Sequence, residues 1–281
     1  MLKIYLKINA FMIFIIGCNM PTESEKYIKP PRFVEKSFSD SKIELGIDAE
    51  HRLKHGIQLM WYSDGNDDID YYSIFRGNGQ TIAEIPFENI GEVGFSDLLS
   101  FDTLFLDTTA YLHVKYHYYI KGFDNKGNSS PSSDTVTYTL HDSPFAISPI
   151  NAIADSFPTF QWINIVTDFE YTSEFVIRVE KIEANTFSQV WTSRFYNEWF
   201  GFENYTPISF QYFPATSSWD ETNNYFHVNA PSNIITCFGL KTGMQEGTYR
   251  WKIKSISQIN NLSGIDEASG ESPWKYFNIS F

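Results

Sequence analysis

The chain has 281 residues, of which 17% are aromatic and 20% charged, and its formal net charge is −13. This length suits about two domains of ordinary size, and the aromatic content excludes a disordered or collagen-like chain. The acidic balance argues against nucleic acid as a partner, because phosphates require clustered lysine and arginine. The two cysteines are too few for a disulfide-dense scaffold or a four-cysteine zinc site.

The N-terminal segment has the layout of a secretory signal. Two lysines precede an apolar stretch over 8–16, which is too short to span a membrane as a helix. The stretch leads into the tetrapeptide Ile-Ile-Gly-Cys at 15–18, which resembles a bacterial lipobox. The resemblance implies that residues 1–17 are a lipoprotein signal peptide and that Cys18 becomes the lipidated N-terminus. An ordinary signal peptide that contains a cysteine is the alternative.

A lipidated Cys18 predicts a cell-envelope protein that has the membrane as a partner. Two or more acyl chains hold a soluble domain on a bilayer stably. Asn19 follows the cysteine where inner-membrane retention in enteric bacteria usually shows aspartate, so the resemblance implies the outer membrane. Residues 18–30 are polar and contain proline, which is typical of a tether.

From residue 31 onward the sequence has an all-β pattern. Short runs rich in β-branched and aromatic residues alternate with Gly, Asn, Asp, Ser and Pro clusters, and no long stretch has a helical period. A turn over 124–128, in which Gly127 can take a positive φ, predicts a hairpin with a strand over 136–140. A period of two predicts that these residues of the first half face a core: Ile57, Leu59, Trp61, Tyr72, Ile74, Tyr116, Tyr118 and Ile120.

These runs resemble a fibronectin type III domain. The strand ending in Trp61, the Tyr-x-Ile-x-Arg run at 72–76 and the Tyr-x-Tyr-x-Ile run starting at Tyr116 resemble its strands B, C and F. The resemblance implies a domain over 31–141 in which the Tyr116 hydroxyl bonds upstream backbone as a tyrosine corner. Segment 88–101 is long for this pattern and is expected to be an extra excursion.

The second half repeats the scheme more loosely. Runs at 157–162, 175–181, 247–253 and 272–279 resemble strands B, C, F and G, with Phe175, Ile177 and Val179 facing inward. The predicted fold is therefore all-β, with two tandem immunoglobulin-like (fibronectin type III-like) β-sandwiches. The second sandwich is expected over 142–281, with a long insertion at about 185–235.

Two groups of residues in the sequence are candidates for a metal site. The acidic run 64–70 spaces carboxylates like the start of a calcium loop, but it lacks the glycine and the bidentate glutamate that such a loop needs. A polar turn is the favoured interpretation. His113 and His117 are expected on one strand face about 13 Å apart, too far for one metal. We predict no metal and no cofactor.

The sequence offers no recognisable catalytic motif. Cys237 lies in an apolar, strand-like run, which predicts a buried packing role because a reactive thiol needs an exposed, electropositive setting. There is no Gly-x-Ser-x-Gly elbow, phosphate loop or His-Glu-x-x-His helix. We therefore expect no catalytic residues. The enzyme alternative requires a deep polar pocket built by the insertion.

Aromatic residues concentrate in segment 195–226, interleaved with asparagines and acids. Aromatic rings stack on sugars and neighbouring carboxamides and carboxylates bond hydroxyls, so a glycan platform is one interpretation. Packing in an enlarged sandwich is the other, and the alternating pattern favours it. The candidate ligand-binding residues are Trp199, Tyr205, Trp219 and Asp220.

The predicted function is that of a non-catalytic, membrane-anchored cell-envelope lipoprotein acting as a binding or spacer module through its β-sandwich loops. The alternative is a surface lipoprotein that binds carbohydrate through segment 195–226. Apart from the membrane, the expected partner is a polysaccharide or another envelope protein. Part of this interpretation rests on fold analogy, and fold alone does not specify function.

Overall fold

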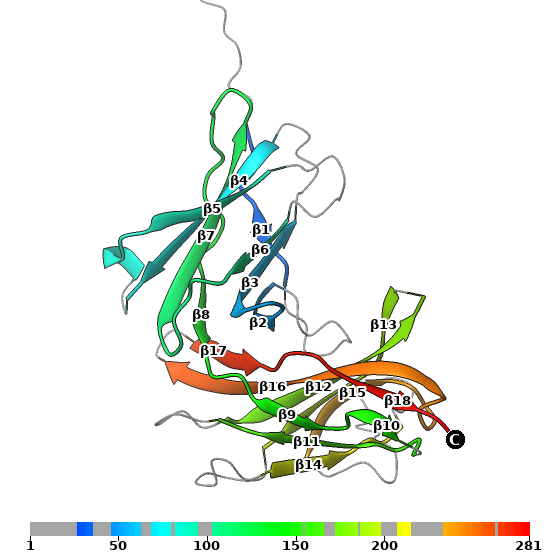
Figure 1. Cartoon of the computed structure of the whole chain (residues 1–281). Helices are drawn as coiled ribbons and strands as arrows, with labels where there is room; N and C mark the ends of the chain where they lie inside the picture. The colour runs from blue at the N-terminus through cyan, green and yellow to red at the C-terminus, as the bar shows by residue number, and fades with distance from the viewer. Residues whose placement is uncertain are drawn as a thin grey trace, which may run out of the picture.

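The computed structural model describes residues 27–35, 46–62, 69–79, 82–94, 103–153, 155–165, 172–184, 186–197, 207–214, 233–261 and 264–281. These residues form two β-sandwiches, drawn one above the other in Figure 1, and one short 3-10 turn, η1 (Ile82–Glu84). Each sandwich has its own hydrophobic core. The fold class is all-β with two tandem sandwiches, as the sequence predicts.

The N-terminal sandwich packs two antiparallel sheets against each other. In one sheet β3 lies between β2 and β6, and β1 pairs with the end of β3; the other has the order β5-β4-β7-β8. The strands β3, β4 and β7 occupy the places predicted for strands B, C and F. The strands are β1 (Arg32–Phe33), β2 (Ile47–His51), β3 (His55–Tyr62), β4 (Ile69–Asn78), β5 (Glu88–Gly94), β6 (Leu104–Asp107), β7 (Lys115–Asp124) and β8 (Val136–Leu140).

The inward-facing positions predicted from the period of two are confirmed. The Tyr116 hydroxyl accepts a hydrogen bond of 3.2 Å from the backbone N–H of Tyr111, which is the predicted tyrosine corner. Gly127 has a φ of +83° in the turn that leads from β7 toward β8. The buried residues are Ile57, Leu59, Trp61, Tyr72, Ile74, Tyr116, Tyr118 and Ile120.

Two details of this sandwich differ from expectation. The segment expected as an excursion contains β5, which pairs with β4 because Ile90 and Val93 pack on the core. His113 does not lie on the strand with His117: it precedes β7 with a φ of +61°. His113 pairs with Asp142, whereas His117 contacts the Gly79 carbonyl and Thr137, so the two histidines have separate partners.

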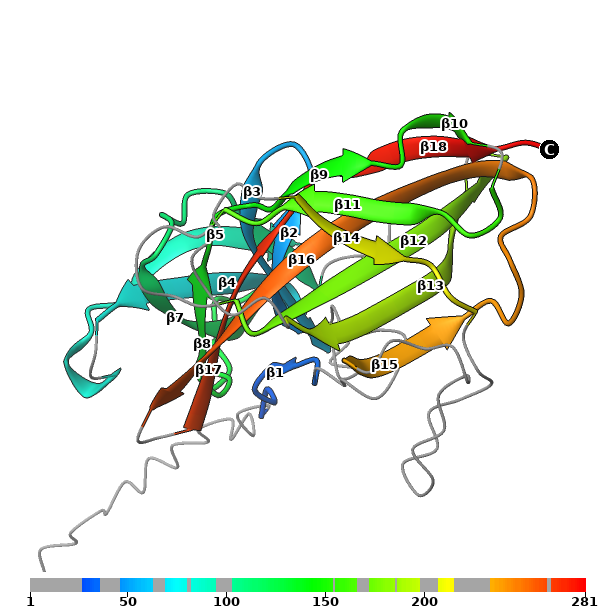
Figure 2. The same ribbon diagram turned by 90° about the horizontal axis from the view of Figure 1, so that it is seen from below.

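The C-terminal sandwich has the same two-layer plan with added strands. One sheet has the order β14-β11-β9, and Figure 2 shows it lying across the other, which runs β15-β13-β12-β16 and continues into β17 and β18. The short β10 pairs with β18 in parallel. The strands are β9 (Phe145–Ser148), β10 (Asn151–Ile153), β11 (Thr159–Ile163), β12 (Glu174–Glu183), β13 (Thr186–Tyr196), β14 (Pro207–Gln211), β15 (Ile234–Gly239), β16 (Gly247–Asn261), β17 (Gly264–Glu271) and β18 (Lys275–Ile279).

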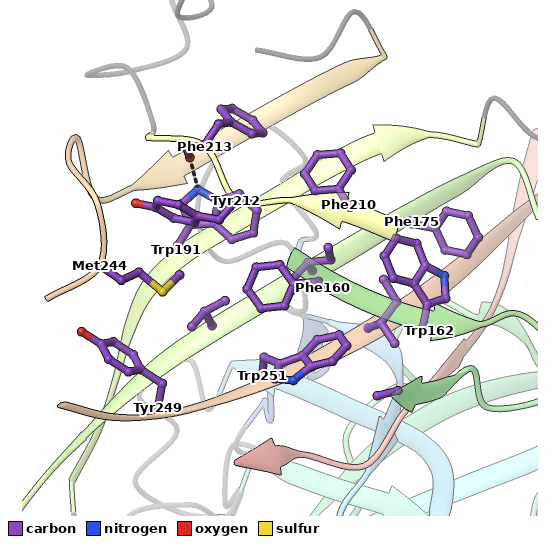
Figure 3. Packing of buried hydrophobic residues seen from close by; sticks show 14 of the residues in the cluster. Phe160, Trp162, Phe175, Trp191, Phe210, Tyr212, Phe213, Met244, Tyr249 and Trp251 are labelled. Atoms are coloured by element: carbon purple, nitrogen blue, oxygen red, sulfur yellow. Dashed lines mark hydrogen bonds between the residues drawn. The ribbon is translucent and has the colours of Figure 1, made fainter. Parts of the chain in front are cut away.

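The core of the C-terminal sandwich is built mainly from aromatic rings (Figure 3). Phe160 stacks on Trp191 with ring centroids 5.8 Å apart, and the Trp191 Nε1–H donates to the Phe213 carbonyl at 3.0 Å. Large rings bury the most apolar area per residue, which suits a sheet widened by β15. The described part of segment 195–226 supplies these buried core residues: Phe195, Phe210, Tyr212 and Phe213. The packing interpretation is thus confirmed for those four.

The two sandwiches share one continuous sheet. Strand β17 pairs in parallel with β8, with Ala268 opposite Thr139 and Ser269 opposite Leu140. This pairing joins the outer strands of both sandwiches into a sheet of 11 strands. In Figure 1 the hairpin β16–β17 lies directly beneath the N-terminal sandwich, where β8 reaches it.

Candidate functional site: the junction between the sandwiches

The residues singled out from the sequence as sites lie outside the described residues. These are the lipidation candidate Cys18 and the ligand-binding candidates Trp199, Tyr205, Trp219 and Asp220. Their roles remain predictions. In the part of the chain that the structure describes, no three His, Cys, Asp or Glu side chains are grouped so that they could hold a metal ion. Helical structure long and apolar enough to cross a bilayer is likewise absent from the described ranges.

Four of the most buried charged groups among the described residues lie where the sandwiches meet: Asp48, Lys252, Lys254 and Glu271. Alternation along β16 points Trp251 and Ile253 into the core, so Lys252 and Lys254 face the opposite side of the sheet. Strand β2 of the N-terminal sandwich lies against that side, with contacts to the β16–β17 hairpin. Both lysine side chains are only 3% exposed.

Lys254 lies in a cluster formed by three strands. Its Nζ contacts Oδ1 of Asp48 on β2 and lies 3.3 Å from Oε1 of Glu267 on β17. The same Asp48 oxygen accepts hydrogen bonds from the Tyr138 hydroxyl at 2.9 Å and from the Ala49 N–H at 2.7 Å. Burial, followed by the nearby Asp48 carboxylate, raises the pKa of Tyr138 well above its ordinary value, so this hydroxyl stays protonated and donates.

Lys252 lies in a second cluster beside the first. Its Nζ is 2.6 Å from Oε1 of Glu271 and 3.8 Å from Oε2 of Glu50. The backbone N–H of Glu271 donates to Nε2 of His55 at 3.2 Å, which requires that nitrogen to carry no proton. Burial, with the neighbouring His51 ring as the second cause, lowers the pKa of His55 to about 4. A neutral His55 therefore bridges the two sandwiches at neutral pH.

The backbone closes the junction tightly. The His141 N–H donates to the Ser269 carbonyl at 2.8 Å. A Cβ atom on Gly270 would lie 1.9 Å from the Asp142 carbonyl oxygen, so only glycine allows this approach. Buried ion pairs are costly to desolvate, but removing one partner costs about 3–5 kcal/mol because the other charge stays buried. Together these contacts favour one placement of the sandwiches.

A second feature lies on the outer face of the C-terminal sandwich, where aromatic rings surround Arg250. We call this group the cation and ring ladder; it consists of Arg250, Glu180, Phe187, Trp274 and Tyr276. The Arg250 guanidinium lies 3.5 Å from the ring centroid of Phe187 and 4.2 Å from that of Trp274. Its Nε donates to Oε2 of Glu180 at 2.7 Å. Phe187 is 51% exposed, and Tyr276, which pairs in register with Arg250, is 54% exposed. These groups form an open, ordered surface of rings beside a paired cation.

Neither feature can be recognised from the sequence alone. Lys252 and Lys254 occupy alternate positions of a strand, which predicts a polar outer face. The neighbouring residues in the sequence do not indicate which acidic residues pair with these lysines. Asp48 lies 206 residues from Lys254 along the chain. With 34 acidic residues in the sequence, the pairing follows only from the way the two sandwiches meet.

Comparison with known proteins adds a fold-level likeness. A scan of the sequence against protein-family models finds no match, and a search of curated proteins finds none either. Among solved structures, the chain is similar to the crystal structure of chicken CNTN1 FN1–FN3 domains, at 12% identity and a TM-score of 0.25. The match covers 90% of this chain and 66% of that chain, just under two thirds of its length. The strand order itself shows two tandem β-sandwiches.

Proposed function

We propose that this chain is a non-catalytic spacer and binding module whose two sandwiches are held at one fixed angle. The observation that carries the proposal is the junction, where a shared sheet and buried ion pairs join the sandwiches. Neighbouring domains that move freely usually meet through modest, polar interfaces with few fixed contacts. A rigid junction suits a module that sets the distance between one attachment point and another.

The fixed angle can be tested by measuring the distance between two nitroxide labels, one on each sandwich, by pulsed electron paramagnetic resonance. Cysteines replace the exposed Tyr111 and Asn278, one on each sandwich, in a Cys18→Ala background, and the buried Cys237 is left unlabelled. One narrow distance distribution is expected between the two nitroxides. A broad distribution would contradict the spacer. Lys252→Met supplies the comparison, because it leaves Glu271 buried without its cation and should broaden the distribution.

We further propose that a lipid on Cys18 holds the module at a bacterial outer membrane. The support is the tetrapeptide at 15–18 and its place after the apolar stretch. Cells fed a labelled fatty acid should incorporate it into the protein, and Cys18→Ala should abolish both incorporation and membrane retention. Unlabelled wild-type protein would overturn the anchor, while leaving the spacer intact.

The cation and ring ladder favours glycan binding as a second candidate function. Exposed rings stack on sugar faces, and Arg250 with Glu180 can bond hydroxyls beside them. Retention of the protein on immobilised cell-envelope polysaccharide is the measurement. Phe187→Ala combined with Tyr276→Ala should reduce retention at least tenfold. Tyr111→Ala, which removes a ring 75% exposed on the other sandwich, is the matched control and should leave retention unchanged. Equal retention of all three proteins would sink this candidate.

A further inference from the structure

The cluster around Lys254 holds the parts of a bond-forming reaction. An amine, a carboxyl group and a second carboxylate come from β16, β2 and β17, which belong to both sandwiches. The side chains of Lys254 and Asp48 are 3% and 1% exposed, and that of Glu267 is 18% exposed. We propose that Lys254 and Asp48 become joined by an amide bond between their side chains, which cross-links the two sandwiches covalently.

The reaction is a condensation that needs no co-reactant. Transfer of one proton from the Lys254 ammonium to the Asp48 carboxylate gives the neutral amine and the carboxylic acid that react. The nitrogen lone pair of Lys254 attacks Cγ of Asp48 to form a tetrahedral intermediate. The C–N bond forms, the C–OH bond breaks and one water molecule leaves. An ammonium and a carboxylate are thus converted to one amide and one water.

Neighbouring groups are placed to assist each stage. The Glu267 carboxylate, 3.3 Å from Nζ, accepts a proton from the attacking nitrogen and returns it to the departing hydroxyl, ending unchanged. The Tyr138 hydroxyl and the Ala49 N–H both donate to Oδ1 of Asp48, where negative charge develops in the intermediate. Because the fold holds amine and carboxyl together, the step is intramolecular and escapes the entropic cost of association.

The second cluster provides an internal comparison. Lys252 and Glu271 are also buried and lie 2.6 Å apart, but they belong to paired strands of one hairpin. The hydrogen bond that Glu271 accepts from the N–H of His51 is 3.3 Å long and goes to Oε2, not to the oxygen that contacts the lysine. The donor pair on Asp48 therefore distinguishes the first cluster as the reactive one.

Tryptic peptide mapping of the folded full-length protein tests the proposal. An amide at Lys254 blocks cleavage there, so fragment 253–275 should appear joined to fragment 43–52, with a mass lower than their sum by one water. Fragments 43–52 and 255–275 should be absent as separate species. Lys254→Arg and Asp48→Ala should abolish the branched species, and Glu267→Gln, which keeps the shape of the side chain, should slow its formation at least tenfold. Lys252→Arg is the matched control and should retain it.

Separate fragments 43–52 and 255–275 from the folded wild-type protein would overturn the cross-link, as would a branch at Lys252. This readout is independent of the spacer. A protein without the branch that still gives a narrow nitroxide distance keeps the spacer and loses the cross-link. A branched protein with a broad distance loses the spacer and keeps the cross-link.

Discussion

The corresponding strands β7 and β16 show how one fold serves two purposes. Strand β7 has 10 residues and β16 has 15, and each turns alternate apolar side chains into its own core. On its outer face β7 carries Tyr119, which stacks on Phe75 with centroids 4.7 Å apart. In β16 the same face carries Arg250, Lys252 and Lys254. Strand β7 also carries Lys115 and Lys121 on this face, but both are only partly buried. The added length of β16 and the burial of its Lys252 and Lys254 against acidic partners make it the strand that holds the other sandwich.

A substitution that damages one hydrophobic core should show whether the two sandwiches unfold together. Trp162→Ala removes a fully buried ring that packs on Phe175 and Phe195, and it should lower the free energy of unfolding by about 3–5 kcal/mol. Because the sheet is shared, Trp61→Ala in the N-terminal core should shift the same single denaturant transition. Two separate transitions, each sensitive to one variant, would show that the sandwiches fold independently.

Removing one junction cation should have an effect of similar or slightly smaller size. Lys252→Met leaves the Glu271 carboxylate buried, so the free energy of unfolding should fall by about 3–5 kcal/mol. Lys181→Met breaks the exposed pair with Glu183 on the same sandwich and should leave the denaturation midpoint unchanged. Equal midpoints for both variants would contradict a structural role for the buried pair.

Acid should weaken the junction through His55. Its pKa is about 4 in the folded protein and about 6.5 when unfolded, so the unfolded chain binds more protons between these values. Stability from this group is therefore complete above pH 6.5 and is lost as pH falls toward 4, by about 3 kcal/mol in total. Denaturation midpoints measured across this range should fall less in His55→Gln, whose amide oxygen can still accept the Glu271 N–H. An unchanged pH slope in that variant would assign the effect to other groups.

The smallest expected effect lies in the N-terminal sandwich alone. Tyr116→Phe removes the hydroxyl that accepts the Tyr111 N–H and should lower the free energy of unfolding by about 1 kcal/mol. With the N-terminal label moved from Tyr111 to the exposed Lys126, the nitroxide distance across the junction should not change. A change in that distance would mean that the tyrosine corner also helps to place the C-terminal sandwich.

Inward-facing positions were predictable from the sequence because a strand buries every second residue, as Phe175, Ile177 and Val179 show. Strand β17 could not be predicted from the sequence, because Gly264–Glu271 is rich in residues typical of loops. It is a strand because it pairs with β16 on one side and β8 on the other. The junction ion pairs were equally hidden, because alternation assigns Lys254 to a face but cannot assign its partner.

The pairing of β17 with β8 has a mechanical consequence. The chain itself connects the sandwiches only through the short segment 141–144 between β8 and β9. Tension applied between the two sandwiches would otherwise stretch that segment first. The β17–β8 backbone hydrogen bonds and the Asp48–Lys254 contact also connect the two sandwiches, so they carry part of the force that would otherwise act on the linker. When the protein is pulled from its two ends, the β17–β8 hydrogen bonds should therefore break before the linker extends, and the proposed amide between Asp48 and Lys254 would keep the sandwiches together after they break.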